Sequence, residues 1–221
     1  MMSKLDKEGE SQQQVTDNGH KGIQLWEGGP YWAETNIGAD KPEESGLYFW
    51  WGDTEGHRPS GETFRFNFDY DNSTIYTCGK SVPKLRSAGW LTSTGVLAPE
   101  HDAAHVKWGG GWRMPTEQEL SDLNNKCDWT WTSRNGVNGY VVCGRGAYDS
   151  NSIFLPCAGY GFWTSLRNAG SDGGYWSSVP YSDGSYYSWY LYFRSGRHYM
   201  YSYGYRRYNG QSVRPVQGSA N

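Results

Sequence analysis

The sequence predicts an α+β fold in which antiparallel strands, one or two short helices and long loops build one domain. Its 221 residues include 30 glycines and 9 prolines, more than long helices tolerate and typical of short strands and turns. Only 36% of residues are hydrophobic but 17% are aromatic, so aromatic rings must supply much of the buried area. The segment RMPTEQELSDLNNKC has the apolar spacing of a helix.

The N-terminal part divides at about residue 21. Residues 1–21 are polar and without periodicity, so we expect a flexible lead. The domain is expected over residues 22–218 and begins with strand-like aromatic runs at 30–36 and 46–52. Residues 53–84 keep no period and are predicted to form a long loop or insertion.

The following elements carry clearer signals. Thr116 can cap a helix near 116–126 while Glu119 reaches back to it, and a shorter helix is expected near 99–105. The segments YVVCGR and SIFLPCAGY predict a hairpin connected by residues 144–151. GYWSS, YSWYLYF, HYMYSY and SVRPV alternate with Ser-Asp-Gly and Ser-Gly turns, which predicts a C-terminal meander of antiparallel strands. We expect the N- and C-terminal strands to lie near each other.

Charge and cysteine usage exclude several classes. A net charge of -3 leaves no electrostatic footprint for nucleic acid, and the absence of a run of about 18 apolar residues argues against membrane insertion. The four cysteines include no CxxC pair; four reduced thiols, or one or two disulfides, fit the sequence. The first residues lack the apolar segment of a secretory signal, so display on a phage particle and detachment from a longer exported surface protein both stay open.

Five blocks of the chain carry a family resemblance: YWAETNIGADKPEESGLYFWWGDT, HDAAHVKWGGGWRMPTEQELSDL, GYWSS, WYLYF and GQSVRPV. Together they resemble the Fibrobacter succinogenes major paralogous domain family, over most of the chain. The resemblance implies a C-type-lectin-like fold. It also implies a variable protein of a diversity-generating retroelement, in which the C-terminal strands and loops hold the diversified positions.

Two departures limit what this resemblance implies. Calcium-dependent lectins place carboxylate and amide oxygens in an EPN or QPD tripeptide followed by a Trp-Asn-Asp run, and this sequence has neither. Formylglycine-generating enzymes share the fold but use reactive cysteines late in the chain, whereas the last cysteine here is Cys157. We therefore expect no metal, no cofactor and no catalysis, with a glycan-acting enzyme as the weakest alternative.

Residues 162–209 are predicted to bind the ligand. Tyrosine supplies large contact area at low entropic cost, while Ser, Gly and Asn supply adaptable polar contacts. We expect a receptor-recognition protein for a protein or surface-glycan ligand; a structural adhesin or tail-fibre module is the alternative, and an oligomer is allowed. The expected solvent-facing contacts are Phe162, Trp163, Arg167, Tyr181, Tyr186, Tyr187, Trp189, Arg194, Arg197, His198, Met200, Arg207 and Tyr208.

Each tyrosine in this segment has a structural alternative, which is cross-strand packing that covers the sheet. In an extended strand, alternation places Tyr199, Tyr201, Tyr203 and Tyr205 on one face. His198, Met200, Ser202 and Gly204 fall on the other face. The residues assigned to the scaffold are Trp176, Leu191, Phe193, Val213 and Val216.

Two short patterns have some features of chemical sites. His101, Asp102 and His105 have the spacing of metal ligands on a helix, but no third ligand follows at a recognisable distance, so a short helix is favoured. The glycines at 109–111 lack the GK[ST] continuation of a phosphate loop, so a tight turn is favoured.

Overall fold

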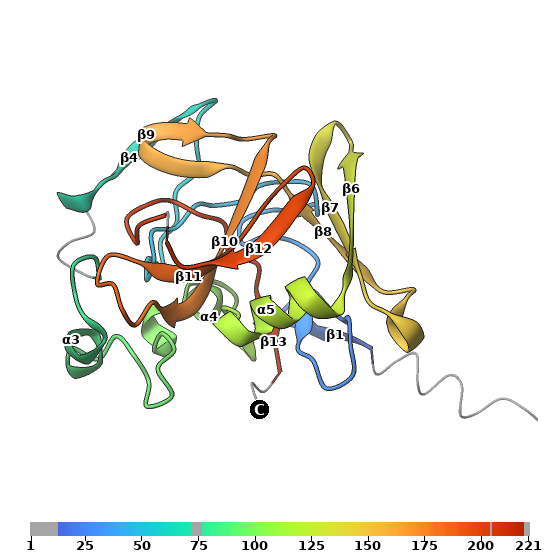
Figure 1. Cartoon of the computed structure of the whole chain (residues 1–221), viewed down its shortest axis with the longest axis horizontal. Coiled ribbons are helices and arrows are strands. Elements are labelled where there is room, and N and C mark those ends of the chain that lie inside the picture. Colours follow the sequence, from blue (N-terminus) through green and yellow to red (C-terminus); the bar gives the residue numbers. More distant parts are fainter. Residues whose placement is uncertain (1–12, 72–76, 204, 219–221) are drawn as a thin grey trace, which may run out of the picture.

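Figure 1 shows the computed structural model, which describes residues 13–71, 77–203 and 205–218. Antiparallel strands dominate and the helices are short, which confirms the α+β class. The α-helices are α3 (Val82–Ser87), α4 (Ala103–Trp108) and α5 (Glu117–Lys126). The strands are β1 (Gln14–Asp17), β2 (His20–Gln24), β3 (Tyr31–Ala33), β4 (Thr63–Phe68), β5 (Trp112–Arg113), β6 (Asp128–Arg134), β7 (Val137–Cys143), β8 (Ser152–Pro156), β9 (Tyr160–Arg167), β10 (Asp172–Pro180), β11 (Ser188–Arg194), β12 (Arg197–Tyr201) and β13 (Val216–Gln217).

The described strands form four sheets, with the orders β1-β2-β3-β13-β5, β10-β11-β12, β6-β7-β8 and β4-β9. In the first sheet, Val216 of β13 pairs with Trp32 of β3 on one side and with Arg113 of β5 on the other. The C-terminal strand therefore lies between an N-terminal strand and the middle of the chain. This confirms the expected proximity of the N- and C-terminal strands.

The predicted flexible lead is wrong for its second half, and the predicted boundary at residue 21 falls inside β2. Residues 14–17 pair with residues 20–23 through a two-residue turn of Asn18 and Gly19, both with positive φ. The hairpin is held because β2 also pairs with β3, which supplies burial that the polar segment lacks by itself. Residues 1–12 lie outside the described part of the chain.

The helix predicted near 116–126 is confirmed as α5. The Thr116 hydroxyl accepts a hydrogen bond from the Glu119 amide at 3.2 Å, and the Thr116 amide donates to the Glu119 carboxylate at 2.8 Å. Arg113 also donates to both Glu119 oxygens, at 2.8 and 2.6 Å, and so ties β5 to the start of the helix. The shorter helix expected near 99–105 appears as a 3-10 turn followed by α4.

Replacing Thr116 with alanine should destabilise the protein by about 1 kcal/mol, because the Glu119 amide loses its acceptor. Thermal unfolding should show a fall in Tm of about 2–4 °C for a chain of this size. A Ser93→Ala variant in an exposed loop is the control and should melt like the parent. An unchanged Tm in Thr116→Ala would show that the cap contributes nothing.

Two sequence expectations fail in the first half of the domain. The run 46–52 is not a strand; it is joined to its neighbours by isolated bridges such as Phe49 with Gln211. Consecutive side chains from Tyr48 to Trp51 are all buried, so the run lacks the alternation of a half-exposed strand. Within the loop expected over 53–84, β4 forms and α3 begins at Val82, while residues 72–76 lie outside the described part of the chain.

The later strands match the sequence more closely. β7 and β8 form the predicted hairpin, and β10, β11 and β12 form the first three strands of the predicted meander. The fourth predicted strand, SVRPV, does not join them: its last residue, Val216, begins β13, which pairs with β3 and β5 instead. β6 was not predicted; it pairs along its whole length with β7 across the turn at Asn135 and Gly136. The five residues assigned to the scaffold are completely buried, as expected: Trp176, Leu191, Phe193, Val213 and Val216.

No disulfide forms among the four cysteines, all of which lie in the described part of the chain. Burial raises the pKa of the Cys127 and Cys157 thiols to about 12, so both stay protonated and unreactive at neutral pH. This resolves the alternative left open by the sequence in favour of four thiols.

Candidate binding surface

The β10-β11-β12 sheet packs one face against a hydrophobic cluster and carries aromatic rings on the other, the outer face. The outer face is itself buried at Trp176 and Tyr190 and opens to solvent at Tyr201. On the buried face, Leu191 of β11 lies opposite Met200 of β12, and Phe193 lies opposite His198. Leu191 and Phe193 are fully buried, and His198 stacks on Trp129 of β6 at 4.5 Å. This face is therefore anchored to the core and to its neighbouring elements.

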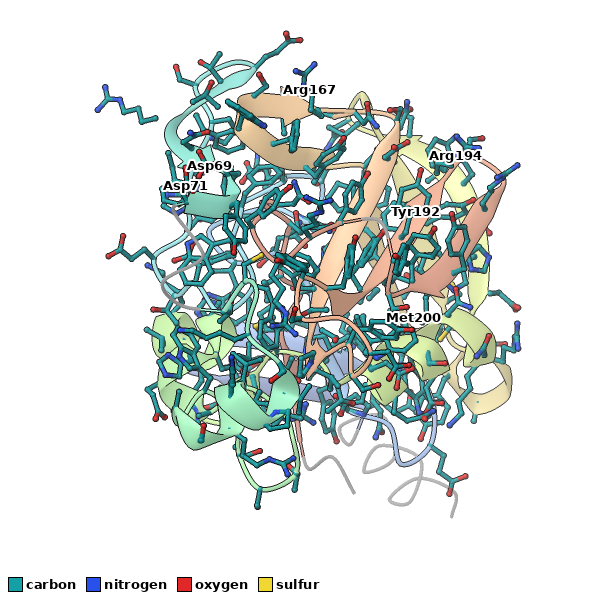
Figure 2. All side chains as sticks on the ribbon, turned by 60° about the vertical axis from the view of Figure 1, so that its left-hand side comes forward. Asp69, Asp71, Arg167, Tyr192, Arg194 and Met200 are labelled. Carbon is teal, nitrogen blue, oxygen red and sulfur yellow. The ribbon has the colours of Figure 1, made fainter. Side chains whose placement is uncertain are left out.

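The outer face of the same strands carries tyrosines in register. Tyr190 lies opposite Tyr201, and Tyr192 lies opposite Tyr199. The ring centroids of the two pairs are 5.8 and 5.4 Å apart, within the range of favourable aromatic contact. Figure 2 shows Tyr192 on this sheet, near Arg194 at the end of β11.

Further rings extend this array beyond the strands. Tyr205 lies 5.1 Å from Tyr190 and 4.3 Å from Tyr160 of β9, and Tyr187 stacks on Tyr203 at 4.7 Å. The backbone of Tyr187 forms an isolated bridge with that of Arg206, the residue after Tyr205. This bridge connects the Tyr187–Tyr203 pair to the rings around Tyr205. We call the set the tyrosine surface: Tyr160, Tyr187, Tyr190, Tyr192, Tyr199, Tyr201, Tyr203 and Tyr205.

The tyrosine surface has a buried base and an exposed rim. Tyr190 is only 2% exposed, whereas Tyr201 is 39% and Tyr203 62% exposed. Burial, together with the nearby Asp172 carboxylate, raises the pKa of Tyr192 to about 12, so this phenol stays protonated at neutral pH. The sequence left open whether the tyrosine rings pack across the strands or face solvent. In the structure the same array contains rings of both kinds.

The predicted contacts separate into three groups. Tyr187, Arg194 and Arg197 lie on or beside the tyrosine surface, the two arginines directly opposite each other in register. Trp163, Arg167 and Tyr186 are exposed, while Phe162, Tyr181 and Trp189 are half-buried. His198 and Met200 lie half-buried on the opposite face of β12, so they do not join the tyrosine surface.

The prediction that Arg207 and Tyr208 face solvent is wrong. Arg207 is fully buried and Tyr208 is 9% exposed. The Arg207 guanidinium donates to the carbonyls of Thr77 and Lys80 at 2.9 and 2.8 Å, and lies over the Trp51 ring. The segment has left its strand by this point, so alternation no longer indicates which side chains face out.

Several members of the tyrosine surface were not among the predicted contacts. The pairing of β11 with β12 brings four of them together: Tyr190, Tyr192, Tyr199 and Tyr201. Alternation along residues 198–203 was the available signal, because it separates the face of Tyr199 and Tyr201 from that of His198 and Met200. The sequence also assigned Gly204 to the face of His198, but Gly204 lies outside the described residues.

A hollow of about 350 Å³ adjoins the tyrosine surface. Tyr160 and Tyr205 of that surface form part of its wall, and Arg206 is its charged residue. The Arg206 side chain donates to the Tyr208 hydroxyl at 3.1 Å, and its backbone amide donates to the Asn209 side chain at 2.8 Å. The hollow thus combines aromatic walls with a guanidinium whose partner is a neutral phenol.

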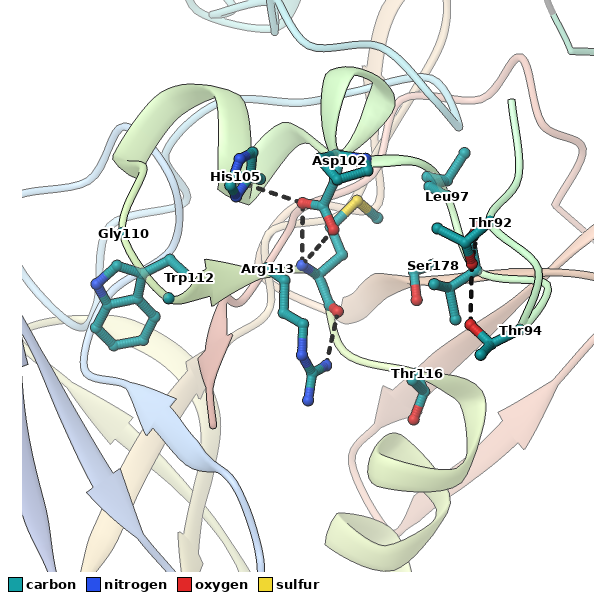
Figure 3. Close-up of a pocket in the computed structure, with 14 residues that line it drawn as sticks. Thr92, Thr94, Leu97, Asp102, His105, Gly110, Trp112, Arg113, Thr116 and Ser178 are labelled. Atoms are coloured by element: carbon teal, nitrogen blue, oxygen red, sulfur yellow. Dashed lines mark hydrogen bonds between the residues drawn. The ribbon is translucent and has the colours of Figure 1, made fainter. Parts of the chain in front are cut away.

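A second hollow, of about 250 Å³, lies between α4, β5 and the start of α5 (Figure 3). Its buried carboxylate is Asp102, which caps α4 by accepting from the Ala104 and His105 amides and also accepts from the Met114 amide. These hydrogen bonds lower the pKa of Asp102, but its burial raises the pKa more. Since backbone amides occupy the carboxylate, its chemistry is that of a helix cap.

A third hollow, of about 570 Å³, contains Asp53 and His57. Their side chains are 3.1 Å apart, and the Asp53 carboxylate also accepts from the Glu55 and Gly56 amides. His101 lies at the same hollow, stacked on Trp90. Within the described ranges, no three His, Cys, Asp or Glu side chains converge as a metal site.

The triglycine segment forms the predicted tight turn. Gly109 and Gly110 have positive φ, and the Gly111 amide donates to the Asp17 carboxylate at 2.8 Å. A Cβ at Gly110 would lie 2.3 Å from that carboxylate, so the turn requires glycine. No α-helix in the described part of the chain is both long and apolar enough to cross a membrane.

Part of the chain is similar to a known family of domains. A family model for a domain of unknown function, DUF8237, matches residues 113–216, which run from β5 to β13 and include the whole tyrosine surface. No curated protein and no solved structure matches the chain.

Proposed function

We propose that the protein binds a macromolecular partner non-covalently through the tyrosine surface, with a protein as the favoured partner. The observation that carries this proposal is the in-register row of tyrosines on the outer face of β11 and β12, whose inner face is fixed in the core. Rings held in this way lose little entropy on binding, and the exposed rings of Tyr201 and Tyr203 offer aromatic area and a hydroxyl to a partner.

The finer proposal is a C-type-lectin-like variable protein of a diversity-generating retroelement. The adjacent N- and C-terminal strands, the helix α5 and the C-terminal meander support such a fold. The exposed rings of Tyr201 and Tyr203 above a buried frame also suit replacement of surface residues without loss of folding. A template repeat and a reverse transcriptase beside the gene would support this role; template mismatches that fall mainly on Trp176, Leu191 and Phe193 would argue against it.

Removal of the exposed rim should abolish binding and preserve the fold. We expect the triple variant Tyr199→Ala, Tyr201→Ala, Tyr203→Ala to lose peptides that are selected on the parent protein from a random 12-residue phage library. Aromatic anchors of this kind commonly contribute about 2 kcal/mol or more each, so the peptide affinity should fall at least about 100-fold. Its Tm should fall by no more than about 5 °C, since Tyr203 is largely exposed, Tyr201 is partly exposed and Tyr199 is half-buried.

The matched control is Val106→Ala with Lys107→Ala on α4, two exposed positions outside the tyrosine surface. Selected peptides that bind the triple variant as well as the parent would refute the proposal. Light scattering of both proteins tests the structural-module alternative. A parent oligomer that becomes monomeric in the triple variant would show that the surface joins copies of this chain instead.

A further inference from the structure

The hollow beside the tyrosine surface contains a positive charge without an acidic partner. Arg206 is exposed, and the polar groups that hold its side chain are the phenols of Tyr208 and Tyr187. No ion pair of the described residues includes Arg206, Arg194 or Arg197. A guanidinium fixed by neutral groups keeps donors available for an incoming anion.

The position of Arg206 is fixed by its surroundings. Its backbone amide donates to the Asn209 side chain, its side chain donates to Tyr208, and its guanidinium lies 5.8 Å from the Tyr208 ring centre. The backbone bridge between Tyr187 and Arg206 holds the same segment from the other side. An arginine restrained in this way gives up less side-chain entropy on binding than a free surface arginine.

The neighbouring outer face carries two arginines and one aspartate in a single row. Arg194 and Arg197 lie directly opposite each other, an arrangement of like charges that is unfavourable in the isolated protein. Asp172 lies in the same row opposite Arg194, and its carboxylate accepts from Asn168 at 2.7 Å. An acidic partner would relieve the repulsion between the two arginines and meet complementary charge along this face.

We propose that the hollow formed by Tyr160, Phe162, Tyr205, Arg206, Tyr208 and Asn209 receives an acidic side chain, Asp or Glu, of a protein partner. The carboxylate accepts from Arg206, while the aromatic walls contact the methylene groups of the same side chain. The volume of about 350 Å³ leaves room for a side chain of this size. The inference rests on the proposed function and specifies the chemistry that the tyrosine surface recognises.

The test uses phage-displayed random 12-residue peptides selected on the parent protein, restricted to those that fail to bind the Tyr199→Ala, Tyr201→Ala, Tyr203→Ala variant. We expect these peptides to be enriched in Asp and Glu relative to the unselected library. Arg206→Gln should weaken them at least about tenfold, because charge-assisted hydrogen bonds are stronger than neutral ones. Replacing the critical Asp or Glu of the peptide by Asn or Gln should lower the affinity by a similar factor. Arg206→Gln combined with this peptide change should lower the affinity little more than either change alone.

Arg206→Lys keeps the charge and should restore part of the affinity, while the control Arg134→Gln should change nothing. The Tm of Arg206→Gln should equal that of the parent, since the side chain is exposed. Surface-dependent peptides that lack acids, or that tolerate Arg206→Gln, would overturn this inference and leave the proposed function standing. If no selected peptide depends on the tyrosine surface, both fail.

Discussion

Replacement of Arg214 by alanine is expected to cost more than about 5 kcal/mol, enough to unfold a domain of ordinary stability. Arg214 is fully buried in the segment before β13. Its guanidinium donates to the carbonyls of Ala33, Glu34 and Phe154 and to the Asn36 side chain, at 2.8–3.0 Å. Each acceptor left unpaired in the interior costs about 1–3 kcal/mol, and the lost side chain leaves a cavity as well.

The measurement is thermal or urea unfolding of the purified variant. We expect the Tm to fall by about 10 °C or more, or the protein to accumulate unfolded. The control Arg134→Ala removes an exposed guanidinium that lies 3.9 Å from Glu43, and should change stability by no more than about 0.5 kcal/mol. A cooperative transition of Arg214→Ala within 2–3 °C of the parent, roughly 1 kcal/mol, would contradict this account.

Arg207→Ala should lower the stability of the fold, whereas Arg206→Ala should weaken peptide binding and leave stability nearly unchanged, although the two residues are adjacent. Arg207 is fully buried and donates to the carbonyls of Thr77, Lys80 and Tyr187. Burial lowers its pKa to about 10, which still leaves it charged at neutral pH. We expect Arg207→Ala to lose at least about 3 kcal/mol of stability, because it unpairs these buried carbonyls and removes the contact with the Trp51 ring.

Arg206→Ala is the internal control for folding, since its side chain is exposed. It should melt within about 2 °C of the parent, a change below roughly 1 kcal/mol, and should bind surface-dependent peptides more weakly. Unfolding monitored by circular dichroism and peptide binding measured at 15 °C distinguish the two effects. Equal destabilisation by both variants would contradict this prediction. It would show that the exposed arginine stabilises the fold as much as the buried one does.

The local elements of the fold could be predicted where a short stretch of sequence contained all of the determining interactions. The capping box of α5 lies within four residues, and the β7–β8 hairpin lies within one continuous segment. Alternation along β12 likewise assigned Tyr199 and Tyr201 to one face and His198 and Met200 to the other. Each of these features depends on neighbours in the chain, so propensity and periodicity are sufficient.

The sequence by itself therefore determined the α+β class, the C-terminal meander, the aromatic character of the outer strand face and the buried scaffold residues. Only the tertiary structure decided which side chains of residues 205–209 are enclosed. Arg207 bonds to carbonyls more than 100 residues away, and Arg214 to carbonyls about 180 residues away. These hydrogen-bond partners depend on how distant segments of the chain pack together, which no local sequence pattern predicts. A buried arginine and an exposed arginine therefore look alike in the sequence.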